Sequence, residues 1–370
     1  MIPKRPRFRP IALLCALSAA LVLYAGCFSS ITGDEDVSET VAADGSAGSN
    51  ANGGAGGSSG NAGGNAPDDP KNEATPAARV VAASELGSLT AADLSKEEFG
   101  DTYTIQLVGK WTDDNLQSLG TELQKITGKH ITLDMAQATG IESIRNFAFK
   151  GCTSLASVTI PAGVTSIGDS AFDGCTSLAS VTIPAGVTSI GNYAFEGCTS
   201  LEAVTIPAGV TSIGVFAFSY CESLASVTIP AGVKSIGFMA FQACFSLASV
   251  TIPAGVTSIE NNTFQACESL ASVEIPAGVT SIGENAFAGC TSLAAVEIPA
   301  SMTRIGGSTF NGCTSLASVT FADTSNWYAT TSYYYTGGDP ISVTNPATNA
   351  NNLKEPSGAW NDKYLYKTAQ

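Results

Sequence analysis

Apolar residues recur along the middle of the chain with a constant period of 23 residues. Eight cysteines mark this period, and no insertion interrupts them: Cys152, Cys175, Cys198, Cys221, Cys244, Cys267, Cys290 and Cys313. Each copy is a close variant of residues 152–174, which read CTSLASVTIPAGVTSIGDSAFDG. A fixed period of this length is typical of a solenoid, in which each turn stacks only on its neighbours.

Within one copy, the pattern predicts two short extended segments. The first alternates apolar and polar residues up to Pro161, which ends it, and the second is the V-T-S-I of residues 164–167. The stretch 170–175 is short and is predicted to form one helical or 3₁₀ turn. We expect eight residues to point inward: Leu155, Val158, Ile160, Val164, Ile167, Ala171, Phe172 and Cys175. Because ordering a turn costs about 1–2 kcal/mol per residue, a single turn cannot fold alone, whereas a stack can.

Different patterns flank the repeats. Residues 103–108 are expected to form a strand, and four apolar residues spaced as on one helix face follow Thr112 and precede Gly128: Leu116, Leu119, Leu123 and Ile126. After Phe321 the period fails and aromatic residues take over: Trp327, Tyr328, Tyr333, Tyr334, Tyr335 and Trp360. Since a solenoid needs covered ends, we predict a strand–helix cap over 78–130, repeats over 131–320 and an aromatic C-terminal cap over 321–370.

The N-terminal segment has the pattern of a secretory signal peptide, predicted over residues 1–26. A basic start is followed by an apolar run over residues 11–23, which is too short for a transmembrane helix. The run ends in Tyr24-Ala25-Gly26-Cys27, which resembles a bacterial lipobox with Cys27 as the lipid-attachment residue, although Tyr24 stands where the family has Leu. An ordinary signal with an incidental cysteine is the alternative.

Residues 27–77 show no hydrophobic period. Residues 45–66 consist only of Gly, Ser, Asn and Ala and carry no charged side chain. Such a composition cannot bury enough apolar surface to fold. We predict a lipid-anchored disordered tether, either a stalk that lifts the repeats off a membrane or a passive linker. The anchor would be the only contact with a membrane.

Composition argues against several classes of function. A net charge of −15 argues against binding of nucleic acid, whose phosphates are bound by clustered Lys and Arg. The chain has one histidine, His130, and no phosphate-binding loop, nucleophile motif or recurrent carboxylate pair. We therefore predict that the protein is not an enzyme and that it has no catalytic residues, no cofactor and no metal site.

The eight repeat cysteines form a ladder at one repeat position. Neighbouring turns are about 4.8 Å apart, and identical sites form no natural pairs. We expect free thiols that fill small buried spaces, rather than the disulfides that are usual in exported proteins.

The repeated L-x-x-V-x-I-P-x-x-V-x-x-I-G-x-x-A-F-x-x-C pattern, over residues 131–320, resembles the BspA-like, or TpLRR-class, leucine-rich repeats of spirochaete-type surface lipoproteins. The resemblance implies a leucine-rich-repeat solenoid of the α/β class, rich in β-structure, with short helical or 3₁₀ turns. It also implies an adhesin on the outer membrane or cell surface that binds proteins or glycans of host matrix, host cells or other bacteria. A periplasmic or envelope scaffolding lipoprotein without an external ligand is the alternative.

Departures from the repeat suggest where a partner would bind. Large apolar residues replace small or polar ones at a group of positions that we predict to form a binding patch: Tyr193, Phe216, Tyr220, Phe238, Met239 and Phe245. Exposed aromatic and Met side chains suit an interface core. The alternative is that these side chains pack down onto the solenoid. The Ser- and Thr-rich strand surface is either a soluble face or a glycan contact.

Overall fold

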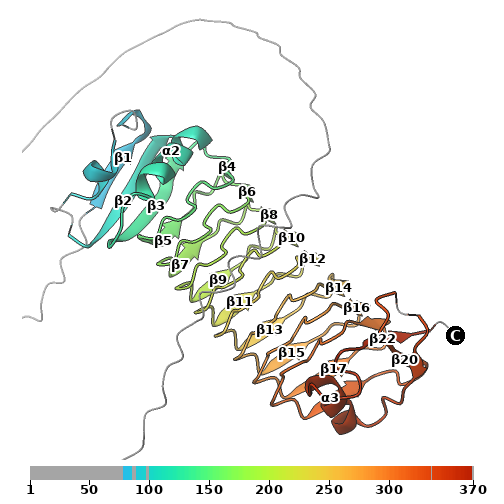
Figure 1. Cartoon of the computed structure of the whole chain (residues 1–370). Coiled ribbons are helices and arrows are strands. Elements are labelled where there is room, and N and C mark those ends of the chain that lie inside the picture. The colour runs from blue at the N-terminus through green and yellow to red at the C-terminus, as the bar shows by residue number, and fades with distance from the viewer. Residues whose placement is uncertain (1–77, 86–88, 97–99, 335, 369–370) are drawn as a thin grey trace, which may run out of the picture. The chain divides into compact units, whose positions relative to one another are not determined.

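The computed structural model describes residues 78–85, 89–96, 100–334 and 336–368 (Figure 1). The predicted signal peptide, Cys27 and the tether lie outside the described residues, as does Tyr335. Among the helices that the structure describes, none is long and apolar enough to cross a membrane.

The N-terminal part is a parallel three-stranded sheet with a helix packed against it. Its elements are β1 (Ala78–Ala82), η3 (Ala83–Glu85), α1 (Ala91–Leu94), β2 (Thr102–Lys110), α2 (Asp113–Leu123) and β3 (His130–Thr139). Strand β3 pairs with the first repeat strand, so this sheet continues directly into the solenoid.

Helix α2 begins as the sequence predicts and ends early. The Thr112 side chain accepts the N–H of Asn115, and Asn115 caps Thr112 in return. The helix ends at Leu123 and not at Gly128. Ile126 is still buried, in the turns that follow the helix, and Gly128 has a φ of +70°.

Two ladders of short strands run along the repeats, with neighbouring strands one period apart paired in parallel except between β7 and β9 in the first ladder and between β12 and β14 in the second. The first ladder consists of β5 (Leu155–Thr159), β7 (Ser180–Thr182), β9 (Ala203–Thr205), β11 (Ser226–Thr228), β13 (Ser249–Thr251), β15 (Ser272–Glu274), β17 (Ala295–Ile298) and β19 (Ser318–Phe321). The second consists of β4 (Ser143–Ile144), β6 (Ser166–Ile167), β8 (Ser189–Ile190), β10 (Ser212–Ile213), β12 (Ser235–Ile236), β14 (Ser258–Ile259), β16 (Ser281–Ile282) and β18 (Arg304–Ile305). These ladders confirm the predicted solenoid, and Figure 1 shows the strands stacked in order.

The third side of each turn differs from the predicted helical or 3₁₀ turn. Residues 170–175 form two successive hydrogen-bonded turns, in which the Asp173 and Cys175 N–H groups donate to the carbonyls three residues earlier. Ser170 has a φ of +52° and Gly174 a φ of +71°, which prevents a continuous helix. The N–H groups of Ser170 and Phe172 instead donate to the next turn, at 2.8 Å each, and so form a third ladder between turns.

The eight residues predicted to point inward are all buried, which confirms the pattern. One phenylalanine from each turn lies in a continuous stack, with neighbouring ring centroids 5.2–5.7 Å apart from Phe149 to Phe310. Such repeated aromatic burial gives every turn the same large apolar contact with its neighbours.

The C-terminal part packs on the last turn. It comprises β20 (Trp327–Thr330), β21 (Asp339–Pro340), α3 (Pro346–Lys354) and β22 (Tyr364–Lys367). Strand β22 pairs antiparallel with β18 and with β20, and α3 lies against β19. Trp327 and Trp360 are buried in this part, whereas Tyr333 and Tyr334 are exposed.

Candidate functional site

Four of the six predicted patch residues come together on the middle turns. The rings of Tyr193 and Phe216 stack with centroids 4.9 Å apart, and Phe238 meets Phe216 edge-on at 5.5 Å. Met239 occupies the same repeat position as Phe216, one turn further on. Tyr193 is 37% exposed, and the other three are half-buried. We call these four residues the aromatic strip.

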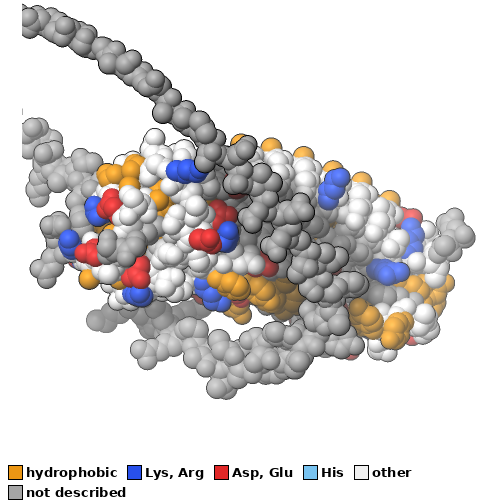
Figure 2. Space-filling view, turned by 90° about the horizontal axis from the view of Figure 1, so that it is seen from above, with side chains coloured by type: hydrophobic (Ala, Val, Ile, Leu, Met, Phe, Trp, Pro, Cys, Tyr) orange, Lys and Arg blue, Asp and Glu red, His pale blue; other side chains and the backbone are white. Residues whose placement is uncertain are grey.

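The remaining two predicted residues lie elsewhere on the turn. Tyr220, which is 44% exposed, occupies the position directly before the repeat cysteine, and half-buried Phe245 the position directly after it. No ring contact joins either of them to the strip among the described residues. On the face shown in Figure 2, hydrophobic side chains gather in patches on an otherwise polar surface with few charges.

Three of the four strip residues hold an unfavourable backbone conformation. Tyr193, Phe216 and Met239 have φ values of +57°, +56° and +56°, in the left-handed region. Asn262 and Asn285 occupy the equivalent position in later turns, and Asn tolerates this conformation better than other residues that have a Cβ. The strip therefore places large apolar side chains where the backbone alone would favour Asn or Gly.

The strip also interrupts a ladder of side-chain hydrogen bonds. At the preceding position, the carboxylate of Asp169 accepts the N–H of Asn192 at 2.7 Å, and the amide oxygen of Asn192 accepts the N–H of Val215 at 2.8 Å. Val215 and Phe238 carry no side-chain oxygen, so they cannot continue this ladder. The side chains of these two residues therefore add no hydrogen bond to the fold, although their backbone carbonyls accept the N–H groups of Tyr193 and Phe216.

Acidic side chains lie beside the strip. Burial raises the pKa of the Tyr193 hydroxyl, and the carboxylates of Glu196, Asp169 and Asp173 raise it further. Burial and the nearby charge of Asp173 raise the pKa of Glu196 to about 7, against a smaller effect of Lys150. Lys150 forms an ion pair with Asp173 at 2.8 Å. The end of the strip at Tyr193 is thus apolar, with acidic side chains around it.

The repeat cysteines are free, buried thiols at equivalent positions, as predicted. From the second turn on, each Sγ donates to the carbonyl of the phenylalanine 26 residues earlier, as Cys175 does to Phe149 at 3.0 Å. Burial raises the pKa of Cys152 and of Cys313 to about 12. Because the thiolate is the reactive form, burial disfavours reaction of these thiols. His130 is exposed at the start of β3.

A break in the second ladder lies between β12 and β14. In most turns, the residue after the strand is a glycine whose N–H donates to the preceding turn, as Gly237 does to Ile213 at 3.0 Å. Glu260 takes this place after β14, and no backbone hydrogen bond joins it to Ile236. A Cβ on Gly214 would lie 2.4 Å from the backbone of the previous turn. A side chain at this position therefore forces neighbouring turns apart.

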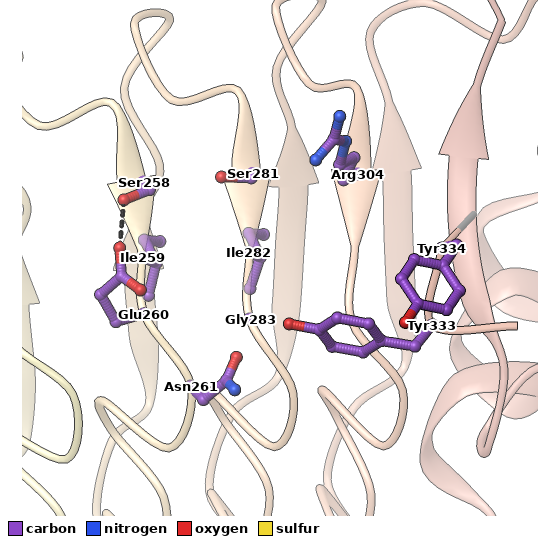
Figure 3. A pocket seen from close by; sticks show the side chains of 10 residues that line it. All are labelled: Ser258, Ile259, Glu260, Asn261, Ser281, Ile282, Gly283, Arg304, Tyr333 and Tyr334. Atoms are coloured by element: carbon purple, nitrogen blue, oxygen red, sulfur yellow. Dashed lines mark hydrogen bonds between the residues drawn. The ribbon is translucent and has the colours of Figure 1, made fainter. Parts of the chain in front are cut away.

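Beyond this break lies a groove of about 420 Å³ (Figure 3). Strands β14, β16 and β18 form its floor, and the loop after β20 forms one wall. Ten residues line it: Ser258, Ile259, Glu260, Asn261, Ser281, Ile282, Gly283, Arg304, Tyr333 and Tyr334. Figure 3 shows Arg304 and the two tyrosines at one end and Glu260 with Asn261 at the other.

Sequence reasoning did not single out this groove. Arg304 and Glu260 are visible departures from the Ser and Gly of the repeat, and they signal it in part. The tyrosines lie outside the repeats, so their place beside the groove depends on the pairing of β22 with β18. That pairing has no counterpart in the periodic pattern.

The profile of a family described as "BspA type Leucine rich repeat region" matches residues 130–248 and 234–352, with six copies. Among curated proteins, none matches the chain significantly.

Several solved structures are similar. A T. pallidum leucine-rich-repeat protein is 33% identical over 50% of this chain and 77% of that chain, with a TM-score of 0.41. A leucine-rich-repeat protein from Bacteroides ovatus is 29% identical over 50% of this chain and 60% of that one, with a TM-score of 0.41. A leucine-rich cell surface protein from Faecalibacterium prausnitzii is 27% identical over 60% of this chain and 79% of that one, with a TM-score of 0.32.

Proposed function

The chain belongs to the BspA type leucine-rich-repeat family, and from this premise we propose that it is a surface-displayed lipoprotein adhesin. In this proposal, Cys27 carries the lipid anchor and the tether holds the solenoid away from the membrane. The aromatic strip binds protein partners on host matrix, host cells or other bacteria. The family membership supports a protein-binding repeat module, and the strip supports a specific contact surface on it.

One observation carries the proposal: the strip breaks local rules of the repeat at adjacent positions. A left-handed backbone costs about 1–2 kcal/mol for residues with a Cβ, and Tyr193, Phe216 and Met239 all adopt it. Partial exposure of their side chains leaves part of the apolar surface unburied. The repeat imposes this backbone on every turn to form the third ladder, so it is the choice of large apolar side chains at a position that suits Asn, and not the backbone itself, that points to a functional role.

The chemistry around the strip indicates the kind of protein surface that would fit. Tyr and Phe are enriched at interface centres, where they bury large areas. Glu196, Asp169 and Asp173 lie close to Tyr193, so a partner with an apolar centre and Lys or Arg at its edge is complementary in charge. The net charge of −15 also favours encounter with basic partners.

Surface display is tested by protease treatment of intact cells. A broad-specificity protease suits this experiment because residues 45–66 contain no Lys or Arg for trypsin. We expect release of a compact repeat fragment from unbroken cells. Protection until the outer membrane is opened would contradict surface display and favour the envelope scaffolding alternative.

Binding through the strip is tested with Phe216→Asn combined with Phe238→Asn. Both substitutions introduce a residue that the repeat already uses at these positions, in Asn262 and Asn261, so the chain should fold. We expect cells that display this variant to attach several-fold less to immobilised matrix proteins and epithelial monolayers than cells with the natural chain.

The control is Tyr220→Gly with Phe245→Thr, which also removes two aromatic side chains in favour of repeat residues but leaves the strip intact. Attachment should be unchanged in this control. Equal attachment by the strip variant and the natural chain, at equal surface amounts, would refute the proposed role of the strip.

A further inference from the structure

We propose that the groove beyond the β12–β14 break binds an acidic oligosaccharide. A carboxylate of the ligand pairs with Arg304, sugar rings pack against Tyr333 and Tyr334, and sugar hydroxyls bond to the polar side chains of the floor. This site is separate from the aromatic strip and does not depend on it.

The floor offers two serine hydroxyls and a guanidinium at regular spacing. Ser258, Ser281 and Arg304 are partners in successive pairs of β14, β16 and β18, so their side chains leave the same sheet face about 4.8 Å apart. This spacing is comparable with the rise of one sugar residue in an extended chain. The Ser258 hydroxyl donates to the Glu260 carboxylate at 2.5 Å, which leaves its oxygen able to accept a bond from a ligand.

The wall consists of two tyrosines with large exposed faces. Tyr333 is 63% exposed and Tyr334 is 82% exposed, and their rings lie at 82° to each other. Tyr333 rests edge-on against Tyr364, whose hydroxyl donates to Glu284 at 2.7 Å. The position of Tyr333 is therefore fixed from below while its ring remains open to a ligand. Aromatic walls combined with a few placed polar groups are typical of small-molecule sites.

The two ends of the groove carry opposite charges. Arg304 replaces the serine of the repeat at one end, and a guanidinium holds a carboxylate through paired, charge-assisted hydrogen bonds. Glu260 at the other end accepts hydrogen bonds and repels a second negative charge. This polarity favours a ligand with its carboxylate at one end and neutral hydroxyl groups at the other, as in a short acidic glycan.

The same geometry disfavours a peptide. Strand β16 pairs with β14 and β18, and β18 pairs with β16 and β22. Both edges of β16 and β18 are occupied, so a peptide could extend the sheet only at the unpaired edge of β14. The floor presents hydroxyl groups rather than apolar pockets for alternate side chains.

The test measures binding to the full chain in detergent by calorimetry and ligand-observed NMR. The acidic probes are 3′-sialyllactose and tetragalacturonate, and lactose is the neutral comparison. We expect both acidic probes to bind at least tenfold more tightly than lactose. Failure of both acidic probes to bind at millimolar concentration would overturn the proposal.

Three variants locate the site. Arg304→Ser restores the repeat residue, and we expect it to reduce affinity for the acidic probes to that for lactose. Tyr333→Ala with Tyr334→Ala should abolish binding of all three sugars. Lys234→Thr, which removes one positive charge outside the groove and also restores the repeat residue, should change nothing.

Unchanged affinity for the acidic probes in Arg304→Ser, with a native thermal transition, would overturn the assignment. The strip variant Phe216→Asn with Phe238→Asn should bind the sugars like the natural chain. Failure of the adhesin proposal and failure of this one are thereby distinguished.

Discussion

At the scale of single residues, the half-buried carboxyl of Glu196 links protonation to stability. Its pKa is raised from 4.5 to about 7 by burial first and then by the charge of Asp173. The folded chain therefore holds this proton more tightly than the unfolded chain does. The resulting contribution to stability is fully present below about pH 4.5 and is lost as pH rises to about 7.

We predict that Glu196→Gln flattens the pH dependence of the free energy of unfolding over this range. After allowance for partial exposure, the variant should be more stable than the natural chain by about 1–2 kcal/mol at pH 8. The difference should shrink as pH falls toward 5. Urea unfolding of both chains across this range measures it, and a difference that stays constant with pH would show that Glu196 does not titrate there.

Inward-facing residues could be predicted because the repeat presents them many times. Val158 and Ile160 alternate with polar neighbours, and each is buried as expected. The left-handed backbone at Ser170 could not be predicted in the same way, because Ser, Tyr, Phe, Met and Asn all occupy that position. The sequence indicated a positive φ only in the second of the two hydrogen-bonded turns, where a glycine precedes several of the repeat cysteines.

At the scale of elements, the break between β12 and β14 follows from one residue. Glycine follows the strand in neighbouring turns because a Cβ there would overlap the previous turn, as at Gly191, where it would lie 2.6 Å from the Gly168 backbone. Glu260 prevents this close approach. The N–H groups of Thr257 and Glu260 consequently lack the backbone bonds that their equivalents make.

We predict that Glu260→Gly closes this break. Two recovered backbone hydrogen bonds would contribute about 0.5–1.5 kcal/mol each, and the entropy of glycine would offset about 0.5–1 kcal/mol. The net expectation is a gain of about 1 kcal/mol in the free energy of unfolding. Hydrogen exchange should show slower exchange at the amides of residues 257 and 260.

The reverse change serves as the control. Gly214→Ala places a Cβ 2.4 Å from the Gly191 backbone, so it should open a second break and lower stability. If Glu260→Gly left both the amide exchange and the stability unchanged, the cause of the break would lie elsewhere.

At the scale of the whole molecule, periodic and non-periodic parts differ in what sequence can predict. Each turn repeats its contacts with the next, so one correct assignment of strand and core positions applies along the stack. The C-terminal part is built from single contacts between distant segments, such as the antiparallel pairing of Arg304 with Tyr366. The groove combines both parts, and for that reason the repeat pattern alone did not single it out.

This modular construction predicts that one whole repeat can be removed. Deleting Thr153–Cys175 joins Cys152 to Thr176 and preserves the order of inward residues. The deletion removes Asp173, and Lys150 takes its place one turn before Glu196. Glu196 thus has an oppositely charged neighbour in the shortened chain. We expect a folded chain that retains the cooperative thermal transition at somewhat lower temperature, because stability in a solenoid depends on the number of turns and interfaces.

Deleting Ser154–Cys175, which is shorter by one residue, is the matched control. It leaves an extra residue between Cys152 and the next leucine, so the core of the joined turn loses its register although its composition hardly changes. Circular dichroism and thermal melting should show a large loss of stability for this deletion alone. Equal stability of the two deletions would mean that contacts beyond neighbouring turns hold the molecule together.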